Sequence, residues 1–206
     1  AYKFKNNKSR YFQSRLNEFR GVILSANPIA LVFGELPLAI EYYMQERMGY
    51  EVQFSLLRSP FFERDAAVKT DDLYERGYAV AVKQKFYQED KNYGMLYLGH
   101  EFRFTQMIYK VNALLSTNPQ ASNIQTIKEA CQKYEYSIFL GNRIIRDAGE
   151  SGITLDAFIG IGVGYRQYNG QDYSGGNYWM KEKFSDVPKT KLTVPLRVGL
   201  NIGYVF

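Results

Sequence analysis

The chain has 206 residues, which is enough for one sizeable domain, and its longest apolar run, 29–33, is far shorter than the roughly 20 residues of a membrane-spanning helix. Composition therefore excludes a helical membrane protein, but not a membrane barrel whose strands cross with about 10 residues each. The net charge of +5 comes from Lys and Arg residues spread along the chain, which does not indicate a nucleic-acid footprint.

Residues 1–20 are the exception to this even spread of charge. Their charged residues are Lys3, Lys5, Lys8, Arg10, Arg15, Arg20 and, alone among the acids, Glu18. We interpret 1–20 as a basic N-terminal segment, either solvated or in contact with lipid phosphate or a periplasmic partner. The rest of the chain, 21–206, is interpreted as a single domain.

From residue 21 onward, apolar residues alternate with polar or small ones, the pattern of strands with two different faces. The eight predicted strands cover about 21–33, 36–46, 49–57, 77–88, 94–106, 133–144, 152–167 and 191–206. In the first of them the apolar phase slips near Asn27-Pro28, where a proline would suit a bulge or a bend.

The predicted connections alternate in length, short at 47–48, 89–93 and 145–151 and long at 58–76, 107–132 and 168–190. Tight turns at one end and long loops at the other are typical of transmembrane barrels with an even number of strands. The first hairpin, through Gly34-Glu35, is short where a long loop is expected. In the second long connection, "SNIQTIKEACQK" has capping-box spacing between Ser122 and Gln125, which predicts a short helix.

The two faces of the strands differ in charge, and this indicates which face lies inside. A soluble lipocalin-type barrel would enclose the apolar face, whereas a membrane barrel turns that face outward. The polar face carries both signs of charge, as a packed polar lumen needs, because buried charges persist when they are paired. The predicted lumen ion-pair network consists of Glu41, Glu51, Lys83, Lys85, Glu101, Arg103, Glu135, Arg143, Asp156, Arg166 and Arg197.

Glycines and aromatic residues favour the same arrangement. Glycines at 160, 162, 164, 199 and 203 recur on the polar face, and the run "GIGVGYRQYNG" lacks the strand–turn–helix context of a nucleotide-binding loop. Aromatic residues gather toward strand ends on the apolar face, as a membrane girdle requires: Tyr42, Tyr50, Tyr78, Phe86, Tyr134, Tyr165, Tyr204 and Phe206. We therefore expect an all-β fold, an eight-stranded antiparallel transmembrane up-and-down β-barrel whose polar lumen is filled by side chains.

The last strand ends in "GYVF", and this ending resembles the C-terminal strand of bacterial outer-membrane proteins. The resemblance implies that Tyr204 and Phe206 form a signal for the barrel-assembly machinery. The chain from residue 21 is similar to small barrels of the OmpA/OmpX type, and "NPIALVFGELPLAIEY" resembles uncharacterised outer-membrane barrels of Bacteroidota. These resemblances imply an exported protein, its signal peptide removed, in a Gram-negative outer membrane beside lipid and lipopolysaccharide, with both termini periplasmic.

His100, in "YLGHEFRF", is the only histidine, and its phase places it on the apolar face together with Gln84 of the preceding strand. Polar groups facing hydrocarbon usually mark a functional surface, so Gln84 and His100 form a candidate partner interface. The alternative is a local bulge that turns both inward. Some lipid A deacylases place a His and a Ser on the outer barrel wall, but position 102 here is Phe.

The expected function is that of a non-enzymatic accessory subunit, which binds a larger outer-membrane complex for assembly, secretion or nutrient import. The alternative is a lipid A-modifying enzyme that uses His100. We expect no cofactor, metal or nucleic acid; Asp71 and Asp72 are a weak calcium signal without further ordered ligands. The aromatic connection after Tyr168 either binds a ligand or packs over the barrel mouth.

Overall fold

The computed structural model describes residues 21–44, 48–58, 73–90, 94–114, 124–145, 152–169 and 190–206. The basic segment 1–20, the Asp71-Asp72 pair and most of the connection after Tyr168 lie outside these ranges. The elements are β1 (Val22–Ala26), α2 (Pro28–Val32), β2 (Glu35–Met44), β3 (Met48–Arg58), β4 (Leu73–Asp90), β5 (Gly94–Leu114), β6 (Ile124–Ile145), β7 (Gly152–Asn169), β8 (Thr190–Thr193) and β9 (Leu196–Val205).

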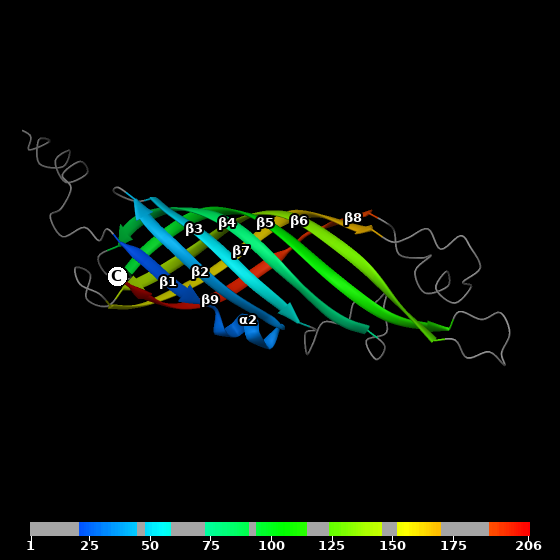
Figure 1. The fold of residues 1–206 in the computed structure, drawn as a ribbon. Helices are drawn as coiled ribbons and strands as arrows, with labels where there is room; N and C mark the ends of the chain where they lie inside the picture. The colour runs from blue at the N-terminus through cyan, green and yellow to red at the C-terminus, as the bar shows by residue number, and fades with distance from the viewer. Residues whose placement is uncertain are drawn as a thin grey trace, which may run out of the picture.

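The strands form a closed antiparallel β-barrel (Figure 1). Each strand from β1 to β7 pairs with the next, β7 also pairs with β9, and β9 pairs back with β1. The short β8 pairs with the far part of β7 and continues as β9 after Val194-Pro195, so the two share one position in the wall. The wall therefore has eight strand positions, as the alternation predicts.

The alternation of the two faces is also confirmed. In β3, Tyr50, Val52 and Phe54 are exposed, while Glu51 and Ser55 are buried. The same division holds for most of the described wall, with the network carboxylates, lysines and arginines inside and most Leu, Ile and Val side chains outside; aromatic side chains occur on both faces. A lipocalin-type arrangement with an apolar interior is therefore wrong for this chain.

The first predicted strand, 21–33, is shorter than expected. β1 ends at Ala26, and α2 begins two residues later. The Asn27 side chain caps the helix by accepting a hydrogen bond from Ala30 N at 3.2 Å. Pro28 occupies the first turn of the helix, where the N–H group that proline lacks would have no partner within the helix. Gly34, at φ 77°, then turns the chain into β2. The predicted bulge at Asn27-Pro28 is thus a helix start.

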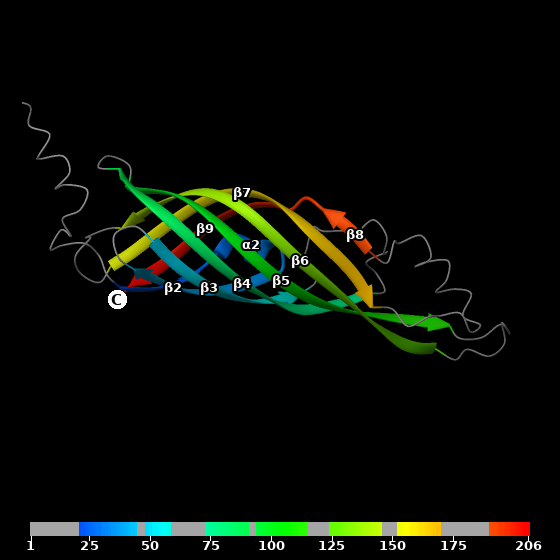
Figure 2. The same cartoon turned by 90° about the horizontal axis from the view of Figure 1, so that it is seen from above.

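Strands β5 and β6 are much longer than predicted. They pair without interruption from Met95↔Arg143 to Leu114↔Ile124, and Figure 2 shows this ribbon extending past the other strands. The predicted long connection 107–132 is therefore mostly strand, and the predicted helix near Gln125 is wrong. An isolated capping box does not stabilise so short a helix, whereas each added strand pair satisfies backbone groups in a continuing ladder.

The two ends of the barrel differ. We call the end that carries Val22 and Phe206 the near rim, and the end that carries α2 and the tip of the β5–β6 ribbon the far rim (Figure 1). At the near rim Phe206 N donates a hydrogen bond to Val22 O at 3.0 Å, which joins the last residue to the first strand. Within the described residues, no helix is both long and apolar enough to cross a membrane.

Candidate functional site

Lys85 lies in the near-rim half of the lumen and reaches carboxylates from three different strands. Its Nζ atom lies 2.8 Å from Glu41 Oε2, 2.5 Å from Glu51 Oε2 and 3.1 Å from Asp156 Oδ2. All four side chains are essentially inaccessible to solvent. Charges this deeply buried are tolerated only because each has an oppositely charged partner in contact.

A second cation, Arg143 of β6, binds two of the same carboxylates. Its Nη2 atom lies 2.7 Å from Glu41 Oε2 and 2.9 Å from Asp156 Oδ2. Two tyrosines complete the cluster: the Tyr87 hydroxyl donates to Glu41 at 2.5 Å, and the Tyr97 hydroxyl donates to Asp156 at 2.6 Å. Glu41 and Asp156 are therefore each bound by side chains from more than one other strand, and the cluster joins β2, β3, β4, β5, β6 and β7 across the lumen.

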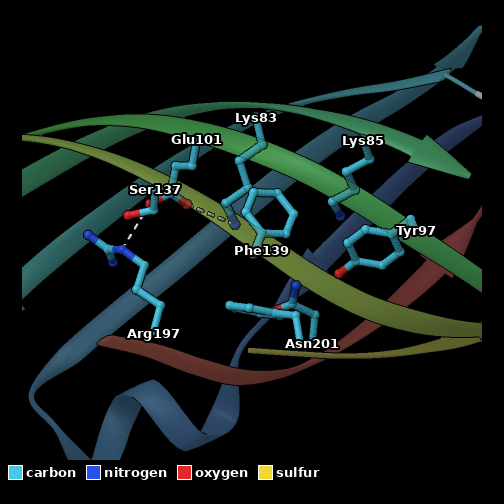
Figure 3. Close-up of a pocket in the computed structure, with 9 residues that line it drawn as sticks. Lys83, Lys85, Tyr97, Glu101, Ser137, Phe139, Arg197 and Asn201 are labelled. Carbon is cyan, nitrogen blue, oxygen red and sulfur yellow. Dashed lines mark ion pairs between the residues drawn. The ribbon is translucent and has the colours of Figure 1, made fainter. Parts of the chain in front are cut away.

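The ion pairs continue toward the far rim (Figure 3). Lys83 Nζ lies 2.8 Å from Glu51 Oε1 and 3.4 Å from Glu101 Oε2. Glu101 also contacts Arg197 Nε at 3.0 Å, and Arg197 Nη2 lies 2.7 Å from Glu135 Oε2. Lys83 and Glu101 thus connect the near-rim cluster to a chain of charges that ends on β6 and β9.

Two residues of the predicted network have other neighbours. Arg103 pairs with Glu35 at 2.9 Å, a carboxylate outside the predicted network because the second strand was predicted to begin at Leu36. Arg166 lies in β7 opposite Lys133 of β6 in the strand register. Ten of the eleven predicted lumen residues take part in the ion pairs described here.

Aromatic side chains fill the space that the ion pairs leave. Tyr97, Tyr87 and Phe139 form a buried cluster against which Phe158 packs. Glycines on opposing strands make room for them: a Cβ atom on Gly160 would stand 2.7 Å from the Phe139 Cβ atom. The cavity between Lys83, Lys85 and these rings holds only about 10 Å³, room for one water molecule at most, so side chains fill this part of the lumen.

On the outer wall, Gln84 and His100 stand directly opposite each other in β4 and β5. His100 Nε2 lies 3.0 Å from Gln84 Oε1, and Gln84 Nε2 donates to the Tyr50 hydroxyl at 3.0 Å. The register of β4 and β5 is continuous, and their neighbours Lys83, Lys85, Gly99 and Glu101 are buried inside. The bulge alternative is therefore wrong, and both side chains lie on the exterior.

The surroundings of His100 are amide and aromatic. Its ring lies 6.4 Å from the Phe86 ring and 5.9 Å from the Tyr136 ring, centroid to centroid. Among the described residues, no serine, threonine or carboxylate makes a hydrogen bond or ion pair with His100. Over the same residues, no group of three or more His, Cys, Asp or Glu side chains could hold a metal ion.

The predicted girdle residues are exposed and fall into two groups along the barrel. One group lies toward the near rim and consists of Tyr42, Tyr50, Phe86, Tyr204 and Phe206; the other lies toward the far rim and consists of Tyr78, Tyr134 and Tyr165. The terminal pair, Tyr204 and Phe206, packs edge to face, with ring centroids 5.0 Å apart.

No protein-family model, curated protein or solved structure matches this chain.

Proposed function

We propose that this barrel spans a bacterial outer membrane. The support is its exterior, where Leu, Ile and Val side chains form a band between two groups of exposed aromatic residues, as lipid-facing barrel walls have. In water such a surface would be a continuous apolar patch around the molecule, which soluble monomers rarely expose. The aromatic C-terminus and the resemblance to Bacteroidota barrels make that outer membrane the proposed location, with insertion by the barrel-assembly machinery.

Within that membrane, we propose a non-enzymatic accessory subunit that docks against a larger outer-membrane protein. The observation that carries this proposal is the polar triad Tyr50, Gln84 and His100, in which Gln84 and His100 interrupt the apolar outer wall beside the near-rim aromatic residue Tyr50. The groups bond to one another, but the ring of His100 keeps a second nitrogen and Gln84 a second N–H for a partner. Polar groups facing lipid are costly, so their retention on this wall favours a protein contact there.

A lipid A-modifying enzyme that uses His100 is the second candidate. It is favoured by the outward position of this imidazole at the membrane wall, where a lipid substrate would lie. Against it stands the finding that, in the described part of the chain, no serine or threonine hydroxyl and no carboxylate is bonded to His100. Mass spectrometry of lipid A from cells with and without the protein separates the two candidates, because the accessory role predicts identical lipid A.

The double variant Gln84→Leu/His100→Leu tests the docking surface. We expect it to fold, because leucine suits a lipid-facing position, and to lose the larger partner when membranes are solubilised in mild detergent and the tagged barrel is purified. The measurement is the amount of partner recovered for each barrel. The matched control is Gln106→Leu, which removes another outward amide bonded to a tyrosine, Tyr78, but at the far-rim aromatic group. Equal partner recovery from a folded double variant and from the unaltered barrel would contradict the proposal.

A further inference from the structure

The barrel wall has a break beside β1. This strand pairs with β9 only from Ile23↔Val205 to Ala26↔Ile202, whereas β9 continues as far as Leu196. On the other side of the break, β2 begins at Glu35, beyond the end of β1. Toward the far rim, therefore, no strand joins the edges of β2 and β9 in the described structure, and α2 lies there instead (Figures 1 and 2).

An unpaired strand edge is unfavourable at membrane depth. With no water in hydrocarbon to bind free N–H and C=O groups, such backbone is tolerated only where protein covers it or where it lines a cavity. The helix α2 contacts both β2 and β9, and its Leu31 and Val32 side chains are exposed. A helix of five residues is much shorter than the strands that it separates, so it fills only part of the break.

Behind α2 lies a cavity of about 600 Å³ in the far-rim half of the lumen. This volume lies within the roughly 300–1,000 Å³ that small-molecule sites have. Apolar residues from both sides of the break are among those that line it, namely Ala30, Phe33, Val194, Leu196 and Val198. Lys83, Glu101 and Arg197 of the ion-pair network line the same cavity, so it borders both the break in the wall and the network.

The charge of this cavity is positive. Five cationic side chains line it against three acidic ones, so its lining attracts an anion. Glu35 pairs with Arg103, and Glu135 pairs with Arg197. Lys133 lines the same cavity and, among the described residues, forms no ion pair. Lys133 is half-buried, so within the described part of the chain it is a cation of this lining that is available to an anion.

We propose that this far-rim cavity binds an acidic amphiphile, with the acid group at Lys133 and the alkyl chain toward the break between α2 and β9. The acid group of the ligand then lies among an excess of positive charge. The alkyl group of the ligand covers the edge of β9 that α2 leaves unpaired. The inference rests on the membrane placement proposed above, and it is independent of the docking partner at His100.

The test uses the full purified barrel in uncharged detergent, hexadecanoic acid as the probe and its methyl ester as the comparison. Native mass spectrometry counts the probe molecules retained by each barrel. We expect one retained acid and a much weaker ester signal, because the ester lacks the charge that Lys133 attracts. Lys133→Gln should weaken retention of the acid by about tenfold or more, the effect of losing one charged contact.

Two further variants make the result specific. Ala30→Trp adds bulk to the cavity lining without changing charge, and it should reduce retention of acid and ester alike. Arg76→Gln is the matched control, since Arg76 is exposed on β4 and does not line the cavity. Equal retention of acid and ester, or unchanged retention in Lys133→Gln or Ala30→Trp, would overturn the inference. Flotation of the same barrels with phosphatidylcholine vesicles reports membrane placement separately, so failure of that placement is distinguishable from failure of the cavity.

Discussion

Lys85 shows how one buried side chain can depend on several distant positions of the chain. Its three carboxylate partners come from β2, β3 and β7 and meet only when the barrel closes. Alternation alone predicts that these residues share the interior, because it assigns each of them to the polar face. It does not predict which of them touch, since contacts across the lumen depend on strand tilt and register.

Tyr87 and Tyr97 were not predicted as lumen residues for a different reason. Tyrosine counts as apolar in the alternation, but the hydroxyl of each of these residues donates a hydrogen bond to a buried carboxylate.

Replacement of Lys85 should be severely destabilising. Lys85→Met keeps the length of the side chain but leaves Glu41, Glu51 and Asp156 with too little compensating charge, and breaking a buried ion pair from one side costs about 3–5 kcal/mol. We expect a loss of that size in the free energy of unfolding, measured by urea titration of the barrel in lipid vesicles. Lys191→Met, on exposed β8, is the control and should change stability by less than about 0.5 kcal/mol. A Lys85→Met barrel as stable as the control would show that the cluster does not stabilise the fold.

At the scale of elements, the sequence predicts where the strands lie better than where they end. Period-two alternation located all eight wall positions, because each has one face inside and one outside. The ends depend on local chemistry that the alternation does not report. Asn27 and Pro28 start a helix, and in the sequence this looks the same as a shift in the apolar alternation of a strand. The extra length of β5 and β6 arises because each strand pairs with the other, and neither sequence alone shows it. The cavity behind α2 was not predicted, since it exists only because β1 is short.

The projecting part of the β5–β6 ribbon should be dispensable for barrel stability. β7 pairs with β6 only from Ala130 onward, so the tip beyond Val111↔Ile127 contributes nothing to closure of the wall. The test variant lacks 112–126 and joins Val111 to Ile127 through Asn-Gly. The strand register is preserved because Val111 and Ile127 are directly opposite each other and Asn-Gly favours a tight hairpin turn. We expect the unfolding free energy to change by no more than about 1 kcal/mol. Loss of the compact form in unheated SDS gel electrophoresis would contradict this expectation.

The whole molecule is a polar interior wrapped in an apolar wall, the reverse of a water-soluble barrel. The many buried charges and the small central cavity explain why closure of the wall, rather than an apolar core, holds the strands in place. The continuous pairing of β4 with β5 and of β3 with β4 holds outer-wall residues such as Gln84 and His100 in a fixed register. The larger cavity of the described lumen lies in the far-rim half, beside the break in the wall.

Charge substitutions at two depths test the membrane placement of the whole barrel. Ile161 is 61% exposed midway along β7, and Leu192 is 80% exposed beside the far-rim aromatic residue Tyr165. Arginine on the lipid face costs about 2–4 kcal/mol at the bilayer midplane and about 0–1 kcal/mol near the interface. We therefore expect Ile161→Arg to lower the unfolding free energy in phosphatidylcholine vesicles by about 2 kcal/mol or more relative to Leu192→Arg. In a water-soluble barrel both exposed positions would accept arginine alike, so equal stabilities of the two variants would mean that lipid does not surround this wall.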